Sequence, residues 1–395
     1  MNPQIMQLVT NEIDKILPDI VRIRRAIHQK PEMARVEFET AALVRKTLAP
    51  TGMRLLDPFL ETDVVALLEG KGKGKNVTLR ADMDALPLEE KTGLPHASQK
   101  AGVMHACGHD GHTAMLLGAA LVLSQFRESI KGSVRFVFQP GEEVVAAGRD
   151  LVEKGALLNP EPDAVFALHG LNGLPEGVLA SMPGEMMAAA DFFNIVIKGK
   201  GAHGSRPEIS IDPILVAVRV VESLQAVVSR QINPLDPVVL SVCRIAGGTN
   251  ANIIPDNVEI EGTTRYLKPE LRGNIQACME RIIKGVCESM GASYKFTYVS
   301  AYIPTINHPE MVDFGKRIAH EILGPSSWMD IELPSMAAED FSYYLKRYPG
   351  AFFRLGMGLD MPPLHNARFD FNDNAMRNGI LFLVSAALEI FASKA

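Results

Sequence analysis

Residues 104–115 read Met-His-Ala-Cys-Gly-His-Asp-Gly-His-Thr-Ala-Met and lead directly into an apolar stretch of helical length. Three histidines, a cysteine and an aspartate therefore gather at the start of a predicted helix. Cys107 and His109 stand two residues apart in a glycine-containing loop, so both side chains can reach one ion, and both are ordinary ligands of borderline transition metals. An isolated cysteine is more often a small buried hydrophobe. The neighbouring histidines favour a metal site instead.

Composition limits the class of protein around this stretch. The chain has 395 residues, 47% of them hydrophobic and 22% charged, which predicts two globular domains because single cores stop growing at about 250–300 residues. The net charge of −6 and the absence of long basic runs argue against a nucleic-acid partner. Four widely spaced cysteines suit a reducing compartment. The longest apolar run, 115–123, falls short of the ~20 residues of a membrane span. We therefore expect a cytoplasmic protein with no membrane partner.

Strands and helices alternate on both sides of the metal stretch. The apolar periodicity predicts helices at 5–28, where Pro18 could cause a break, and at 38–48, 111–126 and 146–157. It predicts strands at 64–68, 77–79, 134–138 and 164–168. The glycine-rich segment 70–74 is typical of a hairpin tip between the first two strands. The alternation predicts an α/β domain with a mainly parallel sheet covered by helices on both faces.

The pattern changes after Ser181. The predicted elements are then a strand at 192–197, a helix at 210–229, strands at 238–245 and 258–266, a helix at 269–289 and a strand at 294–299. This β-α-β-β-α-β order is that of a ferredoxin-like α+β domain. We therefore assign residues 1–184 and 300–395 to the α/β domain, which ends in a helix at 373–391, and residues 185–299 to an inserted domain.

Charged and metal-capable residues follow several predicted strands of the α/β domain. Asp82 and Asp84 stand two apart on an extended segment, so they point to the same face. Glu142 and Glu143 follow the next strand, and His169 ends the one after it. Each group alone could be a solvated turn or surface pair. Their coincidence at the carboxyl ends of parallel strands, where open α/β sheets bind ligands, favours one site.

A series of motifs in this order resembles the M20 metallopeptidase and amidohydrolase family, in particular its branch of aminoacylases, hippurate hydrolases and auxin-conjugate hydrolases. The resemblance covers nearly the whole chain. The motifs are RADMDALP (80–87), HACGHDGHTAML (105–116), QPGEE (139–143), LHG (168–170), GxGAHGSRP (199–207), NIIPD (252–256), GTTR (262–265), AEDFSYY (338–344) and LHNARFDFND (364–373).

The resemblance implies a centre of two divalent metal ions, which could be Zn, Mn, Co or Ni. The ligands that it implies are Cys107, His109, Glu143, His169 and His365. Glu142 matches the general base, which takes a proton from the attacking water and returns it to the leaving amine. Asp82 and Asp84 would orient a ligand histidine and tune its basicity.

The inserted domain carries a second polar set that the resemblance makes functional. The histidine that matches His203 reaches the active site of a partner subunit and polarises the scissile carbonyl. Asn252 and Arg265 match positions that hold the free carboxylate of the substrate, a task that suits a guanidinium group. Without the resemblance, His203 would be a surface residue and Arg265 could equally form a salt bridge. The resemblance thus implies a homodimer or higher homo-oligomer, built through the insert as a dimerisation and lid domain.

Three departures from the branch pattern bear on substrate preference. A glycine-rich turn is common after QPGEE, whereas this chain continues with Val-Val-Ala-Ala-Gly-Arg at 144–149. Glu208 stands where a histidine is frequent, and Ala367 replaces a usual proline. None of them removes a predicted ligand or the base. The roles of Arg149 and Glu208 stay open.

The predicted function is hydrolysis of the amide bond of N-acyl amino acids, with a hippurate-like or other aromatic or aliphatic acyl group, to a carboxylic acid and a free amino acid. A metallo-dipeptidase or exopeptidase on the same two metals is the nearest alternative. A binding protein that keeps the metals without catalysis is a third, and the presence of Glu142 speaks against it. The identity of the acyl group, amino acid and native metal is left open.

Overall fold

The computed structural model describes residues 3–392, apart from the side chain of Val145. The chain divides into two compact units. Unit 1 runs to Gly184 and also contains Ile306–Leu333 and the residues from Asp340 onward. Unit 2 consists of Glu185–Thr305 and Pro334–Glu339. The predicted insert, 185–299, lies within unit 2.

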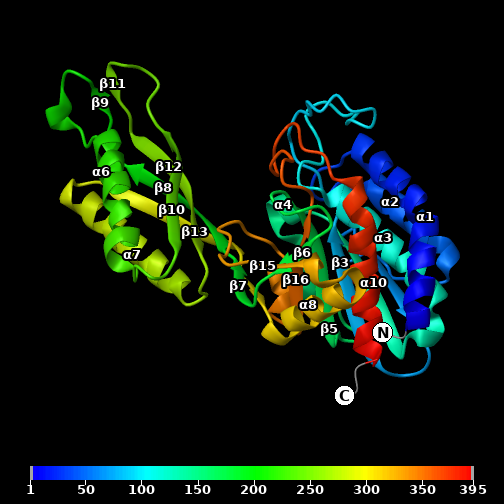
Figure 1. The fold of residues 1–395 in the computed structure, drawn as a ribbon. Coiled ribbons are helices and arrows are strands. Elements are labelled where there is room, and N and C mark those ends of the chain that lie inside the picture. The colour runs from blue at the N-terminus through cyan, green and yellow to red at the C-terminus, as the bar shows by residue number, and fades with distance from the viewer. Residues whose placement is uncertain (1–2, 393–395) are drawn as a thin grey trace. The chain divides into compact units, whose positions relative to one another are not determined.

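The described residues of unit 1 form an eight-stranded sheet with the order β1-β2-β4-β3-β5-β16-β6-β15 (Figure 1). The strands are β1 Arg54–Leu55, β2 Val64–Glu69, β3 Lys75–Asp82, β4 Gly132–Gln139, β5 Ala164–Leu171, β6 Leu179–Ser181, β15 Trp328–Asp330 and β16 Gly350–Gly356. The central strands β4, β3, β5 and β16 run parallel, whereas β1 and β2 form an antiparallel edge. Every residue of β4 is buried, as expected where both faces of a sheet are covered. The predicted fold class is thus confirmed.

The predicted hairpin between β2 and β3 is wrong. Strand β4 lies between them, antiparallel to β2 and parallel to β3. The segment 70–74 instead passes around the start of β4, where the N–H groups of Gly70 and Lys71 donate to the carbonyls of Gly132 and Ile130. The glycines are needed for this close approach, because a Cβ on Gly74 would lie 2.0 Å from the carbonyl oxygen of Lys131.

Helices cover the sheet of unit 1 on both faces. The longer ones are α1 Pro3–Gln29, α2 Phe38–Leu48, α3 His109–Gln125, α5 Ala147–Glu153, α8 Pro309–Leu323 and α10 Met376–Ala392, with short helices α4 Glu142–Val145 and α9 Ser342–Leu345. Pro18 does not break α1. It lies on the exposed side of the helix, while buried Ile13 and Ile20 hold the turns before and after it on the core.

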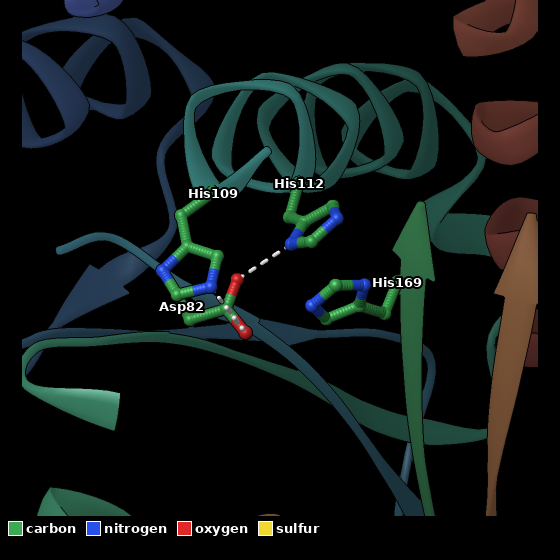
Figure 2. Close-up of side chains that lie close together, drawn as sticks. All are labelled: Asp82, His109, His112 and His169. Carbon is green, nitrogen blue, oxygen red and sulfur yellow. Dashed lines mark hydrogen bonds and ion pairs between the residues drawn. The ribbon is translucent and has the colours of Figure 1, made fainter. Parts of the chain in front are cut away.

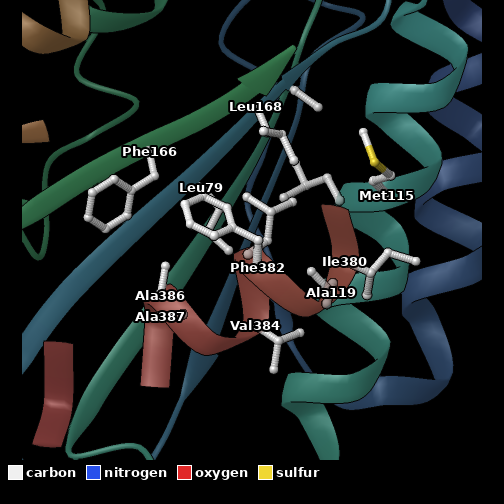
Figure 3. Packing of buried hydrophobic residues seen from close by; sticks show 14 of the residues in the cluster. Leu79, Met115, Ala119, Phe166, Leu168, Ile380, Phe382, Val384, Ala386 and Ala387 are labelled. Atoms are coloured by element: carbon white, nitrogen blue, oxygen red, sulfur yellow. The ribbon is translucent and has the colours of Figure 1, made fainter. Parts of the chain in front are cut away.

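The core that supports the site lies between the sheet and helices α3 and α10. Leu79 and Phe166 of the sheet, Met115 of α3 and Phe382 of α10 belong to this core (Figure 3), and all four are fully buried. By length and composition alone, Asp373–Ala392 is apolar enough to cross a membrane, but 83% of its most apolar window is buried inside the protein. Its apolar side chains thus serve the packing of unit 1.

The described part of unit 2 contains an antiparallel four-stranded sheet with the order β10-β12-β8-β13. Its elements are β8 Ala189–Lys198, α6 Pro213–Ala226, β10 Val238–Ala246, β12 Asn257–Tyr266, α7 Leu271–Ser289 and β13 Ser293–Tyr302. If these strands are numbered by their order along the chain, their order across the sheet is second, third, first, fourth. This order confirms the ferredoxin-like arrangement. Strands β9 Ala202–His203 and β11 Ile253–Ile254 form a separate pair, as do β7 Gly184–Met187 and β14 Thr305–Asn307.

Candidate metal centre

Cys107 and His109 lie at the start of α3, as the sequence predicts. Gly108 has a φ of 89°, a left-handed conformation that a glycine adopts without strain, and it turns the chain into the helix. His109 is the first residue of α3 and is fully buried, and Cys107 is 7% exposed. This turn brings a thiol and an imidazole to the carboxyl ends of β3, β4 and β5.

All five predicted ligands come together in unit 1. Their donor atoms fall into groups within which all atoms lie inside 4.8 Å of one another. The groups are Cys107, Glu143 and His365; His109, Glu142 and Glu143; and Asp82, His109, His112 and His169. Because Glu143 and His109 each belong to two groups, the donor atoms form one continuous cluster.

The distances between the donors lie close to those expected around a shared cation. His365 Nε2 lies 3.0 Å from Glu143 Oε1, Cys107 Sγ lies 3.4 Å from His169 Nε2, and His109 Nε2 lies 4.0 Å from Glu143 Oε1. Metal–ligand bonds of about 2.0–2.3 Å in tetrahedral geometry put neighbouring donors roughly 3.3–3.7 Å apart. His109 Nε2 is also buried without a hydrogen-bond partner among the described residues, and the buried Glu143 Oε1 has only ion-pair contacts with histidines. Such atoms are costly to bury unless a cation or water reaches them, so the donor set fits a metal centre.

Asp84 supports both the glutamates and His109. Its two carboxylate oxygens accept the backbone N–H groups of Glu142 and Glu143, each at 3.0 Å. Its Oδ1 also lies 3.3 Å from Nδ1 of His109. A proton on Nδ1 that faces this carboxylate leaves Nε2 without a proton and able to bind a cation. One buried carboxylate thus positions three members of the cluster.

Asp82 contacts a histidine outside the predicted ligand set. Its Oδ1 lies 2.7 Å from Nδ1 of His112, and Nε2 of His112 accepts the N–H of Gly170 at 2.8 Å. Both ring nitrogens of His112 are therefore used within the protein. His169 in turn directs Nδ1 to the carbonyl of Gly170 at 2.7 Å, which leaves its Nε2 toward Cys107. Figure 2 shows Asp82 facing His112 and His109, with His169 beside them.

Arg80 and Asp340 hold Asp82 in place, and neither is among the site residues predicted from the sequence. Arg80 forms ion pairs of 2.7 Å with Asp82 and with Asp340, and its Nε donates to Gln139 at 3.0 Å. Burial would raise the pKa of Asp82, but His109 and Arg80 hold it well below its usual value. The signal that could have found them is their place in the motifs at 80–87 and 338–344.

The three predicted residues of unit 2 do not form one group. His203 and Asn252 lie together, because the N–H of Gly204 donates to the carbonyl of Asn252 at 2.7 Å and β9 pairs with β11. Arg265 stands near the far end of β12 with its guanidinium 5.8 Å from the ring of Phe192. Asn252 lies before the start of β12 at Asn257, and Arg265 stands eight positions beyond Asn257, a step of about 26 Å at the usual rise of a strand. One chain therefore cannot place Asn252 and Arg265 on the same carboxylate.

Comparison with known proteins agrees with this geometry. The model of peptidase family M20/M25/M40 matches residues 78–389. This chain belongs to that family. The N-acyl-L-amino acid amidohydrolase of Geobacillus stearothermophilus is 44% identical to the M20 chain over 299 residues, which cover 75% of this chain and 80% of the relative. Thermostable carboxypeptidase 1 of Saccharolobus solfataricus is 38% identical over 385 residues and covers 95% and 96% of the two chains.

A solved structure is also similar to the M20 chain over nearly its full length. It is a Bacillus subtilis protein described as a dinuclear metal binding peptidase from the M20 family. The two chains are 33% identical with a TM-score of 0.84, and the match covers 96% of this chain and 99% of that one. The resemblance seen in the motifs is confirmed, and the M20 chain is a hydrolase.

The pKa shifts of the donor side chains in this M20 chain indicate which of them hold a proton that a bound cation would displace. Burial and the Glu143 carboxylate raise the pKa of the Cys107 thiol. Contacts with Cys107 and Glu143 raise the pKa of His365 to about 10. Burial and His112 keep the pKa of His169 well below its ordinary value, so His169 stays neutral and ready to bind. Because ligands must be deprotonated, metal binding would release protons from this cluster.

Two residues at the places where this M20 chain departs from the family pattern form ion pairs with close neighbours in the sequence. Arg149 contacts Asp150 at 3.0 Å on α5, and Glu208 pairs with Arg206 at 3.1 Å on an exposed loop. Ala146 adopts a left-handed φ of 49° between α4 and α5, at the place of the common glycine-rich turn. These observations give Arg149 and Glu208 structural contacts and explain no substrate preference.

Proposed function

We propose that this protein hydrolyses the amide bond of N-acyl amino acids and uses two divalent metal ions. The observation that carries the proposal is the convergence of five donor side chains in unit 1 with the carboxylate of Glu142 beside them. The N-acyl-L-amino acid amidohydrolase of Geobacillus stearothermophilus supports it among the relatives. The mixture of thiolate, imidazole and carboxylate donors suits Zn, Mn, Co or Ni.

In this mechanism, the ligands are Cys107, His109, Glu143, His169 and His365. When bound, the two cations would polarise the scissile carbonyl and lower the pKa of the attacking water. Side chains of the protein carry out the other proposed roles in the reaction. Groups outside the ligand set orient two of the ligands before substrate arrives, since Asp84 faces Nδ1 of His109 and the carbonyl of Gly170 faces Nδ1 of His169.

Glu142 is the proposed general base. It is 6% exposed, and its donor oxygen lies within 4.8 Å of those of His109 and Glu143. Its carboxylate would accept a proton from the attacking water and donate that proton to the amide nitrogen as the C–N bond breaks. Asp84 holds the main chain at both Glu142 and Glu143, so the base keeps its position while its neighbour serves as a ligand.

Unit 2 supplies substrate contacts in the proposal. The N–H of Ser205 donates to Nδ1 of His203 at 3.1 Å, which leaves the proton on Nε2, where it can polarise a carbonyl. We assign the free carboxylate of the substrate to Asn252 and Arg265. Because Asn252 precedes β12 and Arg265 lies near its far end, they are far apart in one chain, and both can act on one substrate only if two chains contribute. This separation supports a homodimer built through unit 2.

The protein would act on small molecules in the cytoplasm without nucleic-acid or membrane partners. Among the described residues all four cysteines are free, which suits a reducing compartment. The net charge of −6 does not favour binding to a phosphate backbone.

The alternative is an exopeptidase on the same metal centre, which the name of the carboxypeptidase relative favours. Metal-free protein, prepared with a chelator, would be assayed on N-benzoyl and N-acetyl amino acids and on dipeptides, before and after addition of Mn²⁺, Zn²⁺, Co²⁺ or Ni²⁺. We expect turnover only with metal and higher kcat/KM on N-acyl amino acids. Full turnover without metal would refute the mechanism, and a preference for dipeptides would establish the alternative.

A further inference from the structure

The segment that carries His365 packs against the start of α3 through a space that two glycines leave. Phe371 is 1% exposed, and its ring lies edge-on to that of His112, with centroids 5.9 Å apart. A Cβ on Gly111 would lie 2.4 Å from Cδ2 of Phe371, and one on Gly108 would lie 3.0 Å from the same atom. A real Cβ does not come within 2.4 Å of a ring, so Phe371 takes this position only because residue 111 is a glycine, and a Cβ on residue 108 would crowd the same ring.

A buried arginine joins the same two segments. Arg24 of α1 is fully buried and forms ion pairs with Asp110, at 2.8 Å, and with Asp370. Asp110 directly follows His109, and Asp370 directly precedes Phe371. A buried charge is tolerated only when it is paired, so Arg24 and the two carboxylates stabilise one another only while both segments are in place.

His365 itself has few other means of support. Its side chain is 53% exposed and its backbone has a left-handed φ of 61°. Its N–H donates to the carbonyl of Ala106 at 2.8 Å, next to Cys107. A non-glycine residue keeps such a conformation only where the surrounding structure imposes it. The position of His365 therefore depends on how residues 365–373 lie against the start of α3.

We propose that Gly111 and Arg24 are positioning residues of the metal centre: they seat residues 365–373 on the start of α3 and so bring His365 to Cys107 and Glu143. Neither residue is a ligand. Gly111 acts by leaving room for Phe371, and Arg24 acts by pairing Asp110 with Asp370. The inference rests on the metal centre of the proposed function. It adds the contacts that hold His365 on one side of that centre.

Gly111→Ala tests the inference, with Gly118→Ala as a matched control. Gly118 lies on the same helix away from the ligands, and its added Cβ would meet Cδ1 of Ile380 at 2.7 Å, so both variants overpack α3. Metal content, affinity by chelator competition, and the visible spectrum of the Co²⁺-loaded protein would be measured. We expect Gly111→Ala to bind one of two metals about 10- to 100-fold more weakly, with an altered Co²⁺ spectrum. Gly118→Ala loses stability but binds both metals as the wild type does.

A compensating substitution separates positioning from damage. Phe371→Leu in the Gly111→Ala background shortens the opposing side chain, and we expect it to restore the affinity and the spectrum. If Gly111→Ala does not fold, Arg24→Lys takes its place, with Arg22→Lys as control, because Arg22 is exposed and pairs with Asp19 of α1 itself. Wild-type affinity and spectrum in Gly111→Ala, or in Arg24→Lys, would overturn the inference. Wild-type protein that binds no metal would overturn the proposed function instead.

Discussion

Replacing Asp84 with asparagine tests whether one buried carboxylate organises the centre. The substitution keeps the shape of the side chain, but an amide has one acceptor oxygen, so it retains at most one of the N–H bonds from Glu142 and Glu143. A buried N–H left without a partner costs about 1–3 kcal/mol. Loss of a carboxylate that orients a ligand histidine lowers metal affinity roughly 10- to 100-fold, which corresponds to about 1.4–2.8 kcal/mol. We therefore expect lower thermal stability, weaker metal binding and lower kcat/KM together.

Glu32→Gln provides the matched control for Asp84→Asn. The carboxylate of Glu32 also accepts two successive backbone N–H groups, those of Glu39 at 3.0 Å and Thr40 at 2.8 Å, at the start of α2. Its substitution should lower thermal stability without changing metal affinity. Calorimetric unfolding and chelator competition on both variants decide the matter. Unchanged metal affinity in Asp84→Asn, or an equal loss in Glu32→Gln, would refute the reasoning.

Three further outcomes are expected. Cys107→Ala should lower both metal content and rate, and unchanged metal stoichiometry would remove Cys107 from the ligand set. If His203 acts across a dimer, mixing inactive Glu142→Ala and His203→Ala subunits should restore part of the activity, whereas no recovery despite demonstrated subunit exchange would count against it. Burial lowers the pKa of His28, but Asp110 outweighs burial and raises it to about 9 from an ordinary value of 6.5. The charged form of His28 thus stabilises the fold below pH 6.5, and this contribution should fade as pH rises toward 9, in a thermal-unfolding series that His28→Gln flattens.

The sequence predicts much of the candidate site because most of its members follow a simple local signal. Glu142 and Glu143 come soon after a buried apolar strand, His169 stands near the end of another, and Cys107 and His109 surround a glycine at a helix start. Parallel strands bring such positions to one edge of a sheet. His365 lacks this signal, since it lies in an irregular loop, and only the family motif pointed to it.

Strand order and hydrogen-bond partners could not be predicted in the same way. The glycine-rich link between β2 and β3 would have the same sequence whether these strands paired with each other or with a third strand between them. Their actual partner, β4, lies about 60 positions further along the chain. Likewise, nothing local reveals that both nitrogens of His112 are used by Asp82 and Gly170. The separation of Asn252 from Arg265 follows from the length of β12, which became clear only with its register.

The place of α10 in the core has a consequence for synthesis. A nascent chain leaving the ribosome completes β3, β4, β5 and α3 long before Met376 appears, so the apolar side of α3 that α10 covers stays open to water through most of translation. Slowly completed apolar surfaces of this kind promote aggregation. A product that terminates before residue 376 would keep every proposed metal ligand and still lack the helix that closes its core.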